Sequence, residues 1–221
     1  MTALLEGERL YRFFHAGDDE ALALRGVSLS VEAGEMVAVT GPSGSGKSTL
    51  LNVLAGLDEP DGGQVRVAGQ RLSRRSEEAR ARIRARHIGI VYQSGNLVGH
   101  LSVAENVALA QRLAGRSRAR AQRGEVLERL GLADRADARP SRLSGGELAR
   151  AGLAVALAND PAVLLADEPT GELDDDTAAT VLDLLAERTS AGSAVVVVTH
   201  DRGVADRADR EVALRDGEVQ A

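Results

Sequence analysis

The sequence predicts an α/β fold in which a mostly parallel sheet is covered by helices. Segments typical of strands and of helices alternate along most of the chain, and this order favours a parallel sheet. Two short apolar runs, residues 162–166 and 194–198, have the pattern of strands that are buried on both faces. A length of 221 residues is sufficient for one such domain with an inserted lobe.

Two apolar-rich strands are predicted to open the chain. Residues 27–31 and 36–40 predict two strands, separated by the turn Glu32-Ala33-Gly34-Glu35. A glycine-rich loop follows the second strand and leads into a helix from residue 47 to about residue 57. Beyond this helix we expect a strand at 65–67, a highly charged helix at 76–86 and a strand at 88–92.

The rest of the chain combines a polar helical stretch with the remaining core elements. Residues 102–136 are polar and rich in helix formers, which predicts an inserted helical lobe. Residues 147–158 form an apolar helix, and residues 177–188 an amphipathic helix with Val181, Leu182, Leu184 and Leu185 on one side. The last strand, at 211–214, is predicted to lie at an edge of the sheet.

The composition excludes several classes of protein. The chain has no cysteine, so disulfide scaffolds, cysteine-ligated zinc, iron–sulfur clusters and thiol nucleophiles are excluded. A net charge of −6 and an aromatic content of 2% argue against a nucleic-acid partner, which requires cations for its phosphates and rings for its bases. No run approaches the roughly 18 apolar residues of a membrane span, and residues 1–12 lack the apolar core of a secretory signal.

A glycine-rich loop after the strand at 36–40 predicts a phosphate site. It fits the pattern G-x-x-x-x-G-K-[ST] with Gly41, Pro42, Ser43, Gly44, Ser45, Gly46, Lys47 and Ser48. The glycines allow a tight turn that brings backbone N–H groups against phosphate oxygens, and the helix that follows directs its positive end at the same anion. We expect Lys47, the one lysine of the chain, to reach the β- and γ-phosphates. Ser48 can ligate Mg²⁺, and Thr49 can contact the α-phosphate.

Two carboxylates follow the buried strand at 162–166. Asp167 and Glu168 lie where that strand ends, and ligands bind at this edge of open α/β sheets. Asp167 is placed to hold Mg²⁺ directly or through water. Glu168 points elsewhere and can orient or deprotonate an attacking water. Together with the phosphate loop, these acids indicate a nucleotide-hydrolysing site, although the loop alone leaves kinase, GTPase and motor ATPase open.

A third motif, Leu143-Ser144-Gly145-Gly146-Glu147, lies between the phosphate loop and the acidic strand, at the start of a helix that Ser144 can cap. In this order the motifs resemble those of the ATP-binding subunits of ABC transporters. The resemblance covers nearly the whole chain. It identifies residues 41–49 as Walker A, Gln93 as the Q-loop glutamine, residues 143–147 with Arg150 as the signature, 163–168 as Walker B, 171–174 as the D-loop and His200 as the switch histidine.

The resemblance implies a fold more detailed than the periodicity alone. It implies one nucleotide-binding domain over residues 1–221, with a P-loop NTPase core. An N-terminal antiparallel β-subdomain is added to this core, and a helical subdomain at about 94–158 is inserted in it. Smaller motifs, among them Asn96-Leu97 and Glu105-Asn106-Val107, are similar to the lipoprotein-release, macrolide-export and cell-division branch.

The resemblance also implies a mechanism with ATP and Mg²⁺. Two subunits would pack head to tail, so that Ser144, Gly145, Gly146 and Asp174 of one contact the ATP held by the other. Gln93 would contact Mg²⁺ or the lytic water, and His200 would bond the γ-phosphate. Phe14 aligns best with the aromatic residue that stacks on adenine, with Tyr11 as the alternative. A separate membrane permease would be the second partner, at the cytoplasmic face of the plasma membrane.

Two departures and two other functions stay open at this point. Glu147 stands where the family usually has Gln, and Glu172 where this branch usually has Asn. Glu147 would bring a carboxylate near the opposing phosphate, unless it points away. The alternatives to transport are a regulatory or cell-division role and a soluble ABC-type protein. DNA-repair members of the second class carry long coiled-coil or zinc insertions, for which this chain has neither the length nor the cysteines.

Overall fold

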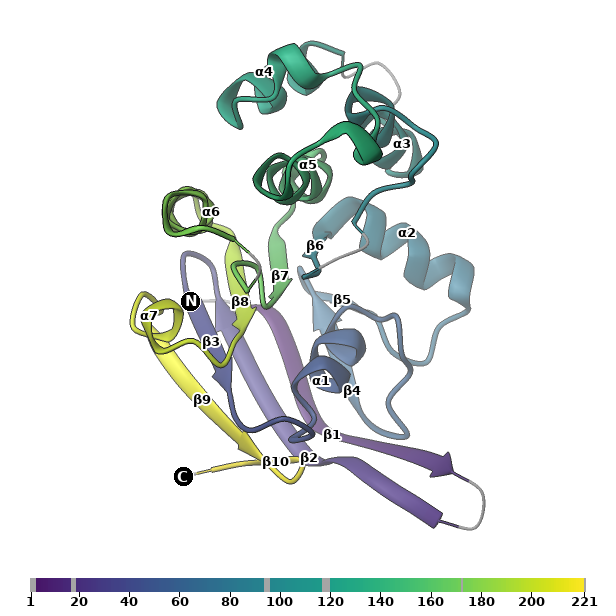
Figure 1. Cartoon of the computed structure of the whole chain (residues 1–221). Helices are drawn as coiled ribbons and strands as arrows, with labels where there is room; N and C mark the ends of the chain where they lie inside the picture. The colour runs from purple at the N-terminus through teal and green to yellow at the C-terminus, as the bar shows by residue number, and fades with distance from the viewer. Residues whose placement is uncertain (1–2, 17–18, 94–95, 117–119, 172, 221) are drawn as a thin grey trace.

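The computed structural model describes residues 3–16, 19–93, 96–116, 120–171 and 173–220, which form two sheets and a group of helices (Figure 1). The predicted α/β class is confirmed. The start of the predicted lobe, residue 94, and the departure at Glu172 lie outside the described residues. No helix in the described part of the chain is both long and apolar enough to cross a membrane.

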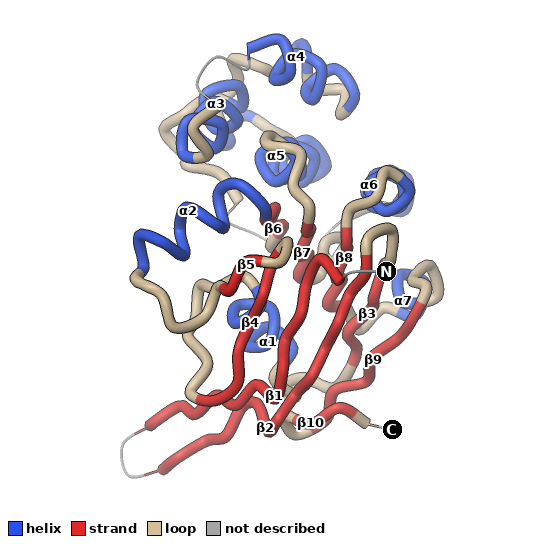
Figure 2. Tube along the Cα trace, turned by 180° about the vertical axis from the view of Figure 1, so that it is seen from behind, coloured by secondary structure: helices blue, strands red, loops and turns tan. Residues whose placement is uncertain are grey.

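The N-terminal sheet is antiparallel, as the family resemblance implies. Its strands are β1 (Ala3–Ala16), β2 (Asp19–Glu32), β4 (Gly62–Val67) and β5 (Gln70–Arg71), in the order β2-β1-β4-β5 (Figure 2). The expectation that the chain opens with a strand at 27–31 is wrong, because β1 precedes it and β2 begins at Asp19. Irregular register between Gly7 and Leu10, with a positive φ of 45° at Arg9, interrupts the alternation that would have indicated β1.

The second sheet is mostly parallel and has the order β10-β9-β3-β8-β7-β6. The pairs that β3, β6, β7, β8 and β9 form with one another are parallel, and β10 pairs antiparallel with β9. Their bounds are Met36–Thr40 for β3, Ile88–Val91 for β6, Val163–Asp167 for β7, Ala194–Val198 for β8, Arg210–Arg215 for β9 and Glu218–Val219 for β10. The strand expected at the edge, β9, therefore lies inside the sheet, because the chain turns back through Asp216 and Gly217 to add β10.

Helices fill the space between the sheets and form a group at one end of the molecule. The first, α1, lies between the two sheets, whereas α3, α4 and α5 gather beyond β6 and β7 (Figures 1 and 2). The helices are α1 (Lys47–Leu54), α2 (Glu77–His87), α3 (Val103–Leu113), α4 (Arg120–Arg129), α5 (Gly145–Leu157), α6 (Asp175–Ser190) and α7 (Arg202–Ala205). Short 3-10 turns occur at Ala133–Arg135 and Pro140–Arg142.

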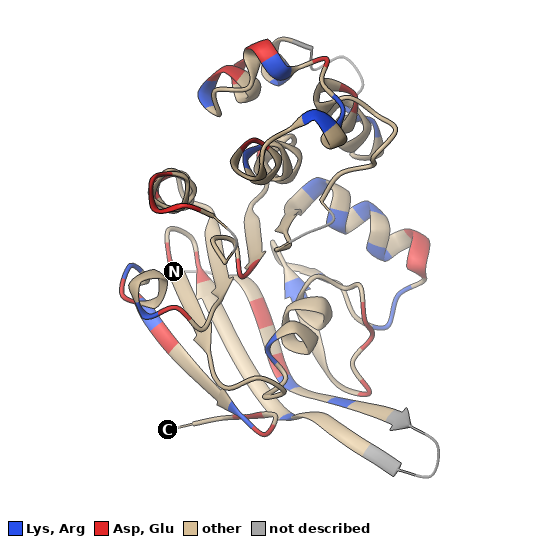
Figure 3. Ribbon diagram, viewed as in Figure 1, with Lys and Arg blue, Asp and Glu red and all other residues tan. Residues whose placement is uncertain are grey.

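Helix α2 carries many charged side chains. Helix α2 has acidic residues in its first turn and arginines after it, and its Glu77 pairs with Arg80 and Arg84 (Figure 3).

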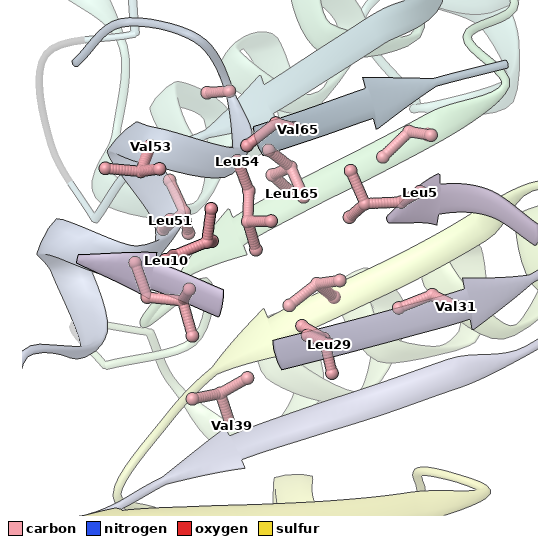
Figure 4. Close-up of a cluster of buried hydrophobic side chains, with 14 of the residues drawn as sticks. Leu5, Leu10, Leu29, Val31, Val39, Leu51, Val53, Leu54, Val65 and Leu165 are labelled. Carbon is pink, nitrogen blue, oxygen red and sulfur yellow. The ribbon is translucent and has the colours of Figure 1, made fainter. Parts of the chain in front are cut away.

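The core between the sheets is aliphatic and surrounds α1, with Leu5, Leu10, Leu51, Leu54 and Leu165 among its members (Figure 4). A second core packs α3, α4 and α5 against β7 and β8. Strand β3 is thus fixed on both sides, which places the loop that follows it.

Candidate functional site

The loop between β3 and α1 is built on backbone that requires glycine. Gly41, Gly44 and Gly46 have φ angles of 148°, 79° and 99°. A Cβ atom at Gly41 would lie 2.0 Å from the carbonyl oxygen of Leu214, and one at Gly46 would lie 2.4 Å from that of Ala23. The loop therefore fits closely between β2 and β9, and its conformation is determined by the two strands beside it.

The N-terminus of α1 is prepared for an anion. Its N-cap, Gly46, makes no side-chain hydrogen bond, and the first turn contains no acidic residue, so N–H groups and the positive end of the helix stay available. Lys47 Nζ donates to the carbonyl oxygens of Gly41 at 2.8 Å and Pro42 at 2.9 Å. Ser45 Oγ is buried and has no hydrogen-bond partner among the described atoms. Together these groups fit a phosphate.

Asp167 and Ser48 supply oxygen atoms beside this anion site. Asp167 ends β7, and burial raises the pKa of its carboxyl group, while a hydrogen bond with the Ser48 side chain and the charge of Lys47 act in the opposite direction. A hydroxyl and a carboxylate oxygen are hard ligands of the kind that Mg²⁺ prefers. The pair therefore fits a magnesium ion next to a phosphate.

Glu168 is held in an uncommon conformation by the strand beside it. Its φ is 45°, which is rare for a residue with a Cβ and requires support from its surroundings. The support comes from β8 and the residues after it. Thr199 Oγ1 donates to Oε2 at 3.1 Å, and the N–H of His200 donates to Oε1 at 3.1 Å. His200 Nδ1 lies 2.7 Å from the same Oε1. Glu168 and His200 are thus brought together.

Gln93 and Glu168 line the same cleft, which has a volume of about 230 Å³. The cleft is lined by Gln93, Glu168 and Gly171, and on its other side by residues of α5, including Gly145. Gln93 is exposed, and its Nε2 would lie 3.5 Å from a Cβ atom on Gly171. The structure therefore places the predicted Q-loop glutamine beside the predicted water-activating acid.

The signature residues form the capped N-terminus of α5. Ser144 Oγ accepts a hydrogen bond from the N–H of Glu147 at 3.2 Å, and Glu147 Oε2 accepts one from the N–H of Ser144 at 2.8 Å, which is a capping box. Arg135 Nε donates to Glu147 Oε1 at 2.7 Å. These bonds lower the pKa of Glu147 to about 2, with the Ser144 N–H as the largest cause and Arg135 next. Glu147 therefore points back at its own chain.

The comparisons with known proteins agree with this geometry. The ABC transporter family matches residues 24–171. The macrolide export ATP-binding/permease protein MacB of Shigella flexneri is 45% identical over 223 residues, and MacB of Escherichia coli K12 is 44% identical. Both matches cover 99% of this chain and 34% of MacB, so the chain spans about a third of these relatives. The chain belongs to the ABC transporter family.

Solved structures support the same assignment. The dimeric structure of MJ0796, a bacterial ABC transporter cassette, has a TM-score of 0.90 and 36% identity, and the match covers 98% of this chain and 97% of that one. A second dimeric structure of MJ0796, in a post-hydrolysis state bound to ADP and Pi, has a TM-score of 0.91. This protein is therefore an ABC-type ATPase cassette, as the motifs predict.

The two groups of predicted ATP-binding residues do not meet within one chain. The Walker A loop lies between the two sheets, whereas the signature residues lie at the start of α5, in the helical group (Figures 1 and 2). Ser144 and Gly145 are exposed there. Asp174 caps α6, where Oδ1 accepts from the N–H of Thr177 at 3.0 Å and Oδ2 from its hydroxyl at 2.8 Å.

The two candidate adenine-stacking residues lie on β1. Phe14 is 40% exposed, and the guanidinium carbon of Arg12 lies 4.9 Å from the centre of its ring. Tyr11 is also 40% exposed and lies beside Gly26 and Gly62. The two rings are equally exposed, so Phe14 stays a prediction with Tyr11 as its alternative.

Sequence reasoning missed two residues that position others in the site. Thr199 bonds Glu168, and its only signal in the sequence is that a polar residue follows the all-apolar run 194–198. Arg135 bonds Glu147, and among the many arginines of the chain nothing sets it apart. Both contacts bring together residues from different elements, which a linear motif does not encode.

Proposed function

We propose that this cassette acts as one of two identical subunits that hold ATP between them and drive a separate membrane permease. The observation that supports this most directly is the separation of its two anion sites. Walker A forms one, between the two sheets, and the capped start of α5 provides the other, in the helical group, with Ser144 and Gly145 exposed (Figure 1). A head-to-tail pair of chains would bring each signature to the other's Walker A loop, and both MJ0796 structures are dimeric.

Within one half of the pair, the residues have distinct tasks. The Walker A loop from Gly41 to Thr49 holds the phosphates through backbone N–H groups, with Lys47 moving from its carbonyl partners to the β- and γ-phosphates. Ser48 and Asp167 would hold Mg²⁺, with Gln93 at its edge. A bound Mg²⁺ neutralises developing charge on the phosphates. Glu168 orients the attacking water and accepts its proton.

His200 and the second subunit would complete the site around the γ-phosphate. With Glu168 ionised, His200 Nδ1 carries the hydrogen in the present contact, because a carboxylate only accepts. The ring would bond the γ-phosphate by turning toward it. Ser144 already accepts from Glu147, so its hydroxyl hydrogen is available to the partner's phosphate. Gly145, Gly146 and Asp174 of the same subunit would line that contact, and Phe14 or Tyr11 would stack on adenine.

The membrane partner is inferred from the relatives. MacB is named an ATP-binding/permease protein, and we extend the permease function to a partner of this cassette, at the cytoplasmic face of the membrane. We also keep the sequence-based boundary of the helical lobe, residues 94–158, which contains α3, α4 and α5. Regulation or cell division is the alternative to transport.

The variant E168Q tests the proposed site. It should bind ATP, lose turnover and form a dimer with ATP that dissociates without it, measured by size-exclusion chromatography with light scattering. E187Q is the matched control, because Glu187 is an exposed residue of α6 whose side chain bonds only Arg129 among the contacts described, and it should behave as wild type. Retained turnover in E168Q, or no ATP-dependent dimer, would contradict the proposal.

A second experiment tests the coupling to a membrane protein. The cassette should co-purify with the integral membrane protein encoded beside it, and vesicles containing both should transport a substrate only with ATP. Co-purification and ATP turnover without transport would instead favour the regulatory or cell-division role. Failure to co-purify would contradict the permease partner while leaving the ATPase site in place.

A further inference from the structure

Thr199 is a buried polar residue at the end of a strand that is otherwise apolar. It directly follows β8, whose five residues are alanine and valine, and its exposure is 0%. Its N–H donates to the carbonyl oxygen of Val39 in β3 at 3.1 Å, so its backbone is fixed by the central sheet. A buried hydroxyl costs free energy unless it is hydrogen-bonded.

The hydroxyl of Thr199 has two partners, and together they fix its direction. Oγ1 accepts from the N–H of Asp201 at 3.0 Å and donates to Glu168 Oε2 at 3.1 Å. A hydroxyl has a single hydrogen, and an N–H can only donate. Since Asp201 occupies a lone pair of the oxygen, the hydrogen is left for the carboxylate. The arrangement therefore directs one donor at one oxygen of Glu168.

The two oxygens of the Glu168 carboxylate have different partners. Oε1 is contacted by His200 through two nitrogens, while among the described residues Oε2 receives its bond from Thr199. The His200 side chain is 75% exposed, whereas Thr199 is fully buried. If the His200 ring turns to the γ-phosphate, the Glu168 carboxylate keeps two of these contacts, the backbone N–H of His200 and the Thr199 hydroxyl.

We propose that Thr199 is a positioning residue for ATP hydrolysis, holding the Glu168 carboxylate at the angle at which it receives the proton of the attacking water. This inference rests on the proposed role of Glu168. Thr199 lies outside the motifs that identified the site. A hydrogen bond to an ionised group contributes more than one between neutral groups, so its loss should be visible in the rate.

The variant T199V tests the inference, because valine has the shape of threonine without the hydroxyl. We expect kcat to fall about 10- to 100-fold, with KM and the affinity for a fluorescent ATP analogue within about twofold of wild type. T199S restores the hydroxyl and should recover most of the rate. In the E168Q background, T199V should cause no further loss of ATP turnover. If valine prevents folding, T199A is expected to give the same rate loss.

The matched control is T189V. Thr189 is also a buried threonine, and its hydroxyl donates to the carbonyl oxygen of Leu185 within α6, away from the site. Turnover of T189V should be unchanged. Wild-type kcat in T199V, together with loss of turnover in E168Q, would overturn the role of Thr199 alone. Retained turnover in E168Q would overturn the role of Glu168 and this inference with it, and poor rescue by T199S would point to a packing role instead.

Discussion

Gly44 and Gly46 offer a comparison within one loop that measures how tightly Walker A is built into the fold. Both have positive φ angles, 79° and 99°. An added Cβ would meet nothing within 4 Å at Gly44, but at Gly46 it would lie 2.4 Å from the carbonyl oxygen of Ala23. Alanine in a left-handed conformation costs about 1–2 kcal/mol at either position. The collision with β2 is added only for G46A, for which we expect a total of about 3 kcal/mol or more.

Urea denaturation measures this difference. With an m-value of about 2 kcal/mol/M, G44A should lower the midpoint by about 0.5–1 M and G46A by about 1.5 M or more, with the slope of the transition unchanged. The control is wild type at the same protein concentration without nucleotide, since a bound ligand would stabilise each variant to a different extent. Equal midpoints for the two variants would refute the close packing of the loop against β2.

Three further predictions concern the anion sites. K47A should lose nucleotide binding in a fluorescence titration while its urea midpoint stays near wild type, and normal affinity would contradict the phosphate cradle. S144A removes the N-cap of α5 and should lower the free energy of unfolding by about 1 kcal/mol; an unchanged midpoint would show that the cap adds no stability. The pKa of Glu147 lies at about 2 in the folded state, below its usual 4.5, so its carboxylate stabilises the fold above pH 4.5 and loses this effect as the pH falls toward 2. The difference in unfolding free energy between wild type and E147Q should therefore shrink over that range, and a difference independent of pH would contradict it.

The elements of the parallel sheet could be predicted because burial on both faces gives a continuous apolar run. Strand β8 is such a case, and the motif after β3 is defined by residue types that the chemistry requires. Strand β1 could not be predicted in the same way, because only one face of it is buried and its register is irregular between Gly7 and Leu10. The position of β9 inside the sheet depends on a partner strand of two residues, Glu218–Val219, which is too short to leave a pattern.

The candidate site shows a similar division between what is local and what is not. Walker A and the acidic pair at the end of β7 are each a continuous motif that directly follows or ends a predicted strand, so both are expected at the same edge of the sheet. The structure places Ser48 and Asp167 together. The partners of Glu168 come from the segment that follows a different strand, β8, and Thr199 lies 31 residues further along the chain. Which side chain meets which across two strands depends on the register of the sheet, and no motif states that register.

The local contacts of Glu147 determine whether its charge opposes phosphate binding at the signature. Taken as a charge alone, a carboxylate at this position would repel the phosphate that the signature is proposed to contact. In the structure its Oε2 accepts the N–H of Ser144, a task that a glutamine side chain oxygen would perform equally well, and its Oε1 is bonded by Arg135. The negative charge of Glu147 is thus paired with Arg135 of the same chain. A glutamate is therefore compatible with a phosphate-binding signature as long as Arg135 accompanies it.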